Sequence, residues 1–241
     1  MAEHGLNLRK GGSPVGDTEP RPLLGLGVVA SVLVGVVAVG RAAFAWSVWT
    51  YYLDADGGEL SYYAARDVRE LLDFAFWSGF LLVTASAVVF LSWLWRARVN
   101  AELICTAPHR RGREWVVWSW FCLGANLWYP FMVLDDVYRA SRPDTPANAS
   151  NLRDEAPGSN LLGLWGLLWA ALLCVTALEL LQPSLPSTDP RQAAMEWIAI
   201  DTAVTVAAAI PLTLVILRIS RWQDAETAAL QAASDDTLTS A

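Results

Sequence analysis

The chain has 241 residues, of which 54% are hydrophobic and only 17% are charged, and its formal net charge is −7. Soluble domains usually carry about 25% charged residues, so this composition indicates a membrane protein. No basic stripe interleaved with exposed aromatic residues accompanies the acidic balance, and nucleic acid is therefore not an expected partner. The three cysteines and two histidines show no metal-site spacing, so we expect no metal and no other cofactor.

Four hydrophobic runs are long enough to cross a bilayer. They cover 23–40, 74–95, 161–178 and 197–217. At about 1.5 Å per helical residue, each reaches roughly the 30 Å of a hydrocarbon core. The sequence predicts an all-α membrane protein with spans at about 23–46, 71–95, 161–182 and 195–218. These form a membrane domain, 23–222, between polar tails at 1–22 and 223–241 that composition predicts to be disordered.

A fifth apolar stretch at 115–134 is interrupted by Gly124, Asn126 and Pro130. These residues break a helix near its centre, and lipid penalises the backbone groups that such a break leaves unpaired. Beyond Pro130, apolar residues recur at helical spacing among charged ones, as in an amphipathic helix. We therefore expect a broken interfacial or re-entrant helical segment at 114–142 in place of a fifth span.

The distribution of arginine and lysine predicts the topology. If 115–134 does not span, both tails and 96–160 share one side with 13 basic residues, against 3 on the other side. If it spans, the split is 9 against 7. Because cytoplasmic loops carry the excess of positive charge, the first arrangement is favoured, with both termini in the cytoplasm.

Two segments are similar to a known family. They are the run FLSWLWRARVNAE at 90–102 and the run WVVWSWFCLGANLWYPF at 115–131, which continues through Asp136 and the YRAS sequence at 138–141. The chain resembles, over roughly residues 70–220, a bacterial family catalogued as domain of unknown function 4328. Tyr138 stands where that family has tryptophan, and Cys122 and Leu123 also depart from its pattern. The resemblance implies a multi-pass protein of the bacterial cell (plasma) membrane and carries no known activity.

The residues that match the family define one candidate site on the cytoplasmic face. They are Arg96, Arg98, Asn100, Asn126, Trp128, Pro130, Asp136 and Arg139. One interpretation is that the arginines enforce topology and reach lipid phosphates. The other is a structured pocket, in which Arg96 or Arg98 pairs with Asp135 or Asp136 and Asn126 satisfies the broken helix. Guanidinium groups suit a pocket for phosphate or carboxylate because they bind both groups in a bidentate manner.

A second candidate lies near the outer ends of the four spans, where counting along each helix brings one ionisable side chain to a similar depth. These residues are Arg41, Asp73, Glu179 and Asp201. Charges at membrane depth are costly unless they are paired or face a wet cavity. Asp201 has apolar neighbours, so we expect the helices of Arg41 and Asp201 to be adjacent and their side chains to pair.

The sequence contains no catalytic motif, and we expect the protein not to be an enzyme. The favoured function is that of a binding or accessory protein acting through the cytoplasmic Arg/Trp motif. Its expected partners are the lipid bilayer, including anionic lipid headgroups, or another membrane protein. The alternative is a small-solute or ion transporter or channel that uses the Arg41 and Asp201 site as an oligomer.

Overall fold

The computed structural model describes residues 20–54, 62–181 and 190–239, and within these ranges it contains helices and no strand. The elements are α1 (Leu24–Asp54), α2 (Tyr62–Ile104), α3 (Trp115–Trp118), η1 (Ala125–Leu127), α4 (Tyr129–Ala140), α5 (Leu152–Glu155), α6 (Asn160–Leu181) and α7 (Pro190–Thr239). Four of them, α1, α2, α6 and α7, are long and apolar enough to cross a membrane. The predicted all-α membrane fold with four spans is thus confirmed.

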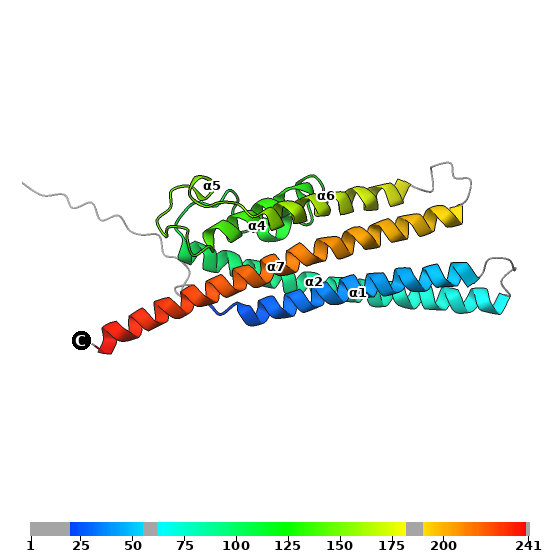
Figure 1. Cartoon of the computed structure of the whole chain (residues 1–241), viewed down its shortest axis with the longest axis horizontal. Helices are drawn as coiled ribbons and strands as arrows, with labels where there is room; N and C mark the ends of the chain where they lie inside the picture. Colours follow the sequence, from blue (N-terminus) through cyan, green and yellow to red (C-terminus); the bar gives the residue numbers. More distant parts are fainter. Residues whose placement is uncertain (1–19, 55–61, 182–189, 240–241) are drawn as a thin grey trace, which may run out of the picture.

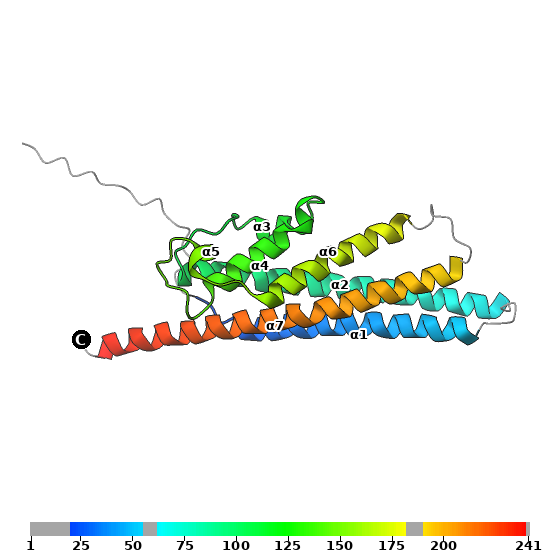
Figure 2. The ribbon, with the colours of Figure 1, turned by 45° about the horizontal axis from the view of Figure 1, so that its top comes forward.

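The four long helices lie side by side, and consecutive ones run in opposite directions (Figures 1 and 2). α7 packs between α1 and α6, and α1 in turn lies between α7 and α2. The short elements α3, η1 and α4 contact α2 and α6 near the end of the bundle where α1 begins and α7 ends. We call this the arginine-rich end, because Arg96, Arg98 and the arginines of 110–142 gather there.

The segment between α3 and α4 runs along the outside of the long helices, away from the arginine-rich end, and then turns back toward it (Figure 2). The Trp169 indole Nε1 donates a 2.9 Å hydrogen bond to the carbonyl of Asn126. Trp169 lies nine residues into α6, which places Asn126 about 13 Å along that helix. At the tip, the Leu123 side chain is 98% exposed, as expected of a group that faces lipid. The predicted broken segment is therefore present, and we call it the re-entrant segment because it turns back toward the arginine-rich end.

The helices extend beyond the predicted spans, and the prediction of a disordered tail at 223–241 is wrong over the described residues. α7 continues to Thr239, and Gln223 and Thr227 are buried. Together with Ile216 and Ile219 they follow helical spacing, so one face of α7 stays packed past the last apolar residues. Of the N-terminal tail, residues 1–19 lie outside the described part of the chain.

The close packing of α1 against α7 and α2 depends on Gly27. The Trp93 indole on α2 donates a 2.9 Å hydrogen bond to the Ser220 hydroxyl on α7, and both groups are buried. A Cβ atom at Gly27 would lie 2.2 Å from that hydroxyl oxygen and 3.2 Å from the Trp93 nitrogen. Since small residues allow membrane helices to approach closely, Gly27 lets three helices meet at one buried hydrogen bond.

Substitution of Gly27 should therefore destabilise the bundle. Gly27→Ala should lower the free energy of unfolding by about 1–3 kcal/mol, because the new methyl group displaces the Ser220 hydroxyl. Thermal unfolding in detergent measures this effect. The matched control is Gly35→Ala on the same helix, where a Cβ meets nothing within 4 Å and helix propensity favours alanine. Equal stability of the two variants would contradict this account of the junction.

Candidate functional site

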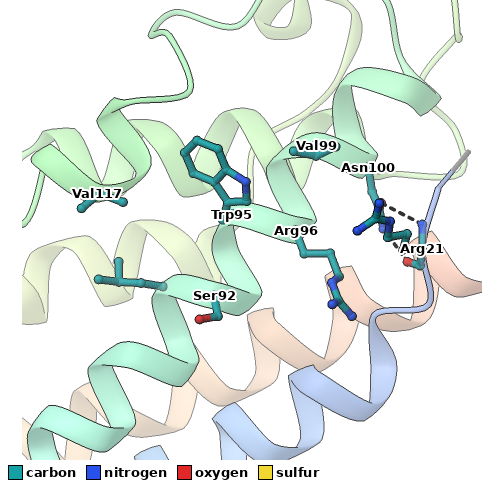
Figure 3. Close-up of a pocket in the computed structure, with 8 residues that line it drawn as sticks. Arg21, Ser92, Trp95, Arg96, Val99, Asn100 and Val117 are labelled. Carbon is teal, nitrogen blue, oxygen red and sulfur yellow. Dashed lines mark hydrogen bonds between the residues drawn. The ribbon is translucent and has the colours of Figure 1, made fainter. Parts of the chain in front are cut away.

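A pocket of about 410 Å³ opens at the arginine-rich end, along one face of α2 (Figure 3). Its lining comes from three parts of the chain: the segment before α1, residues 91–100 of α2, and α3. The lining residues are Arg21, Leu91, Ser92, Trp95, Arg96, Val99, Asn100 and Val117. Two of the predicted site residues, Arg96 and Asn100, thus line a single pocket. The other lining residues are not among the residues that match the family motif, so the sequence did not predict them.

Most arginines of this end have a carboxylate partner in the described structure. Arg98, Arg110, Arg113, Arg139 and Arg142 each pair with a carboxylate. Arg111 and Arg218 have none, but Arg111 lies over the Tyr129 ring and Arg218 donates to the Tyr138 hydroxyl, whereas Arg96 faces a pocket. In the described part of the chain, the Arg96 guanidinium has no carboxylate partner and only donates a 3.3 Å hydrogen bond to the carbonyl of Pro22. A guanidinium has five N–H donors, so most of the capacity of Arg96 is available to a ligand in the pocket.

Asn100 fixes the polar end of this pocket. Its side-chain amide accepts a 3.0 Å hydrogen bond from the backbone N–H of Arg21 and donates one of 2.8 Å to the carbonyl of the same residue. Two residues further on, Asp224 of α7 accepts hydrogen bonds from the backbone N–H groups of Leu23 and Leu24, at 2.6 and 3.1 Å. These are unpaired donors of the first turn of α1, where a carboxylate also complements the helix dipole. The segment before α1 is thereby held against α2 and α7.

The predicted pairing of Arg96 or Arg98 with Asp135 or Asp136 is wrong, because Arg110 occupies both acids. Arg110 donates to Asp136 through its Nε and its backbone N–H, at 2.6 and 2.8 Å. Its Nη2 donates to Asp135 at 2.8 Å. Burial raises the pKa of Asp136 even though Arg110 acts in the opposite direction. The loop before α3 brings Arg110 to α4, and its path is not encoded in any local motif.

Arg98 and Arg139, two further predicted site residues, hold the loops together. Arg98 donates to Glu102 and to the carbonyl of Arg111, both at 2.8 Å. Arg139 pairs with Asp135 at 3.0 Å and donates to the carbonyl of Ala156. Because these guanidinium groups are engaged within the protein, their contribution is to structure.

The other predicted residues of this motif belong to the re-entrant break. Pro130 is buried in the first turn of α4, the position to which its fixed φ suits it. Trp128 is half exposed next to the Tyr129 ring. The Asn126 side-chain oxygen is buried without a hydrogen-bond partner in the described structure, so the expectation that this side chain satisfies the broken helix is wrong. The break is instead satisfied in part by Trp169, whose indole N–H donates a hydrogen bond to the backbone carbonyl of Asn126.

Sequence reasoning missed Asp224 and Gln223 because both were assigned to the tail. Gln223 donates to the carbonyl of Ala97 at 2.9 Å and to the Ser141 hydroxyl at 2.7 Å, and so ties α7 to α2 and α4. The signal that could have found them is the continued helical spacing from Ile216 to Thr227.

In the opposite half of the bundle, Arg41 of α1 and Asp201 of α7 form an ion pair, and the predicted pairing is confirmed. The Asp201 side chain is 5% exposed and that of Arg41 is 47% exposed. The four-residue cluster does not form as a unit. Asp73 is exposed, Glu179 is half-buried, and neither is bonded to the pair in the described structure.

Comparison with known proteins places the chain in a family. The sequence matches the family described as Domain of unknown function (DUF4328) over residues 56–221. The chain belongs to the DUF4328 family. The match covers α2 to most of α7, and so includes most of the pocket and the whole re-entrant segment. No curated protein and no solved structure matches the chain. Among the described residues, no group of three or more His, Cys, Asp or Glu side chains could hold a metal ion.

The Arg41–Asp201 pair should show an asymmetric response to mutation. Arg41→Ala leaves a buried carboxylate uncompensated, which costs about 3–5 kcal/mol in fully buried pairs, whereas Asp201→Ala leaves a guanidinium that can reach the interface. We therefore expect Arg41→Ala to lower the unfolding temperature in detergent more than Asp201→Ala. The double variant should recover part of the Arg41→Ala loss. Additive losses would contradict the pairing, and Asp73→Ala serves as the exposed control.

Stability should also depend on pH through His109. Burial, together with the nearby Arg98 charge, lowers the pKa of His109 to about 3, and both ring nitrogens are buried without a hydrogen-bond partner in the described structure. The unfolded chain takes up a proton near pH 6.5 while the folded protein does not, so folding stability should fall as the pH drops below 6.5.

The expected loss from His109 is about 2 kcal/mol between pH 7 and pH 5. Unfolding curves of the native protein and of His109→Gln at several pH values measure it. The difference between the two proteins cancels contributions from other groups, such as Asp136, whose raised pKa has the opposite sign. Parallel pH dependences would show that His109 titrates normally.

Proposed function

We propose that this multi-pass membrane protein acts by binding and not by catalysis, with the pocket around Arg96 as the binding site. The observation that carries the proposal is the pairing pattern of the arginines. Five arginines of the arginine-rich end are paired with acids of the same chain, whereas Arg96 faces a pocket and has no acid partner among the described residues. The volume of about 410 Å³ falls in the range of ligand sites.

The ligand is an oxyanion, either a phosphate or a carboxylate, presented at the membrane surface. A guanidinium binds these planar or tetrahedral groups with two parallel hydrogen bonds. Trp95, which is 44% exposed, lies beside Arg96 at the mouth of the pocket and suits the boundary between lipid and water.

We further propose that the arginine-rich end faces the cytoplasm of a bacterial cell. The support is the split of 13 basic residues against 3 between the two ends of the spans. On this topology the pocket opens to the inner leaflet, where anionic headgroups and acidic segments of partner proteins are both present.

Transport by an oligomer is the alternative, and it draws on the Arg41–Asp201 pair. The pocket beside this pair, of about 280 Å³, is lined mainly by apolar residues of α1 and α7, including Trp46, Trp49 and Ile198. Because an apolar lining gives a hydrophilic solute little to bind, the surroundings of the pair favour a role in helix packing.

A photoreactive residue in the pocket tests the binding function directly. We expect p-benzoylphenylalanine in place of Trp95 to trap a ligand in cell membranes, and Arg96→Gln to abolish this product because the oxyanion loses its guanidinium partner. Arg153→Gln is the matched control, since Arg153 is exposed on α5 and away from the pocket. Mass spectrometry identifies the trapped species. A product that is unchanged by Arg96→Gln would refute the proposed site.

A further inference from the structure

The pocket around Arg96 is polar at one end and apolar at the other, and the order of the two ends relative to the membrane identifies a class of ligand. Along α2, the lining residues from Leu91 to Asn100 occupy one helix face. Nine residues separate these two, so the pocket follows the helix for about 13 Å. This distance is close to half the thickness of a hydrocarbon core.

The polar groups lie at the end of the pocket that is further from the bilayer centre. Asn100 and Arg21 form this end, and Figure 3 shows Arg96 on the same side of the pocket. Of the three basic or amide side chains here, Asn100 holds the segment before α1, whereas Arg96 adds a cation that no acid of the described chain neutralises.

The apolar groups lie at the deeper end. Val117 of α3 and Leu91 of α2 form its walls, and Trp95 and Val99 lie between them and the polar end. Figure 3 shows Val117 at the far side of Trp95 from Asn100. The Ser92 hydroxyl at this end donates to the carbonyl of its own helix at Val88, and apart from it and the Trp95 indole N–H the lining is hydrocarbon, so it suits a hydrocarbon chain.

A molecule that fills both ends must carry an anionic group at the membrane surface and a hydrocarbon chain directed toward the bilayer centre. That is the orientation of a lipid of the adjacent leaflet. We propose that the pocket binds one anionic glycerophospholipid, with its phosphate on Arg96 and one acyl chain along Leu91 and Val117. The proposal rests on the proposed binding function and names the ligand of the same site.

Lipid retention by the purified full-length protein tests this assignment. The protein is equilibrated in detergent with equal amounts of phosphatidylglycerol and phosphatidylcholine of the same acyl chains, and the lipids that remain bound are counted by native mass spectrometry. We expect one phosphatidylglycerol per protein to be retained in preference to phosphatidylcholine. Arg96→Gln should weaken this retention about tenfold, the usual effect of losing one charge-assisted hydrogen bond. Arg96→Lys should have a smaller effect, because it keeps the charge without the guanidinium fork.

The apolar end has its own variant and a matched control. Ser92 is exposed, lines the pocket and donates its hydroxyl to the carbonyl of Val88. Ser92→Trp should fill the pocket and abolish retention without altering any charge. Ser78→Trp should leave retention unchanged, since Ser78 is likewise exposed on α2 and bonded to its own helix but lies outside the pocket. Unfolding temperatures within about 2 °C of the native protein establish that the variants are folded.

Three results would overturn the assignment. They are equal retention of the two lipids, native-like retention by both Arg96→Gln and Ser92→Trp, and full displacement of phosphatidylglycerol by inorganic phosphate, which would show that the acyl chain contributes nothing. None of these three results by itself contradicts the proposed function, which is binding at the pocket around Arg96. If the photoreactive residue at position 95 traps an acidic protein segment in an Arg96-dependent manner, the site binds but its ligand is not a lipid. If it traps nothing that depends on Arg96, both proposals fail.

Discussion

Backbone polar groups within a bilayer have no water to bond with, and the re-entrant segment is where this constraint is hardest to meet. Most backbone N–H groups in the turns between α3 and α4 donate to carbonyls of the same segment, but the helical break leaves some carbonyls without a backbone donor. Trp169 supplies a donor to one of them, the carbonyl of Asn126. The Trp120 ring packs edge-on against Phe90 of α2 and Trp169 of α6, with centroid distances of 5.3 Å in both cases. One side of the segment is therefore packed against α2 and α6, while its tip stays exposed.

At the arginine-rich end the constraint is different: many charged side chains must be neutralised, whereas in the re-entrant segment backbone groups lack hydrogen-bond partners. The arginine-rich end resolves most of this charge internally, since Arg110 holds two acids of α4 and Asp224 satisfies the exposed donors of α1. Buried pairs of this kind contribute little net stability, but removing one partner is costly, so they fix one arrangement of the loops. Arg96 has no carboxylate partner among the described residues, and the proposed ligand site rests on that difference.

The sequence predicts those features that depend on local chemistry. Hydropathy locates the spans because each helix must be apolar along its own length, and the Gly–Asn–Pro interruption locates the re-entrant break. Counting residues along the helices was enough to bring Arg41 and Asp201 together. It could not choose among Arg96, Arg98 and Arg110 as the partner of Asp136, because the three side chains are chemically identical and only the path of the loop distinguishes them. Composition likewise assigned Gln223 and Asp224 to a tail, since their partners lie about 80 to 200 positions earlier in the chain.

The pocket is built from three parts of the chain, so the proposed binding function would couple ligand binding to assembly. Its walls come from the segment before α1, from α2 and from the re-entrant α3, so it exists only when Asn100 holds Arg21 and when Val117 has packed beside α2. A ligand that binds only the assembled form must stabilise that form by mass action. An anionic ligand would at the same time neutralise the one arginine of this site that the protein leaves without an acid partner in its described structure. Occupancy of the pocket, closure of the segment before α1 and packing of the re-entrant segment would then be linked equilibria, in which a change at any one shifts the other two.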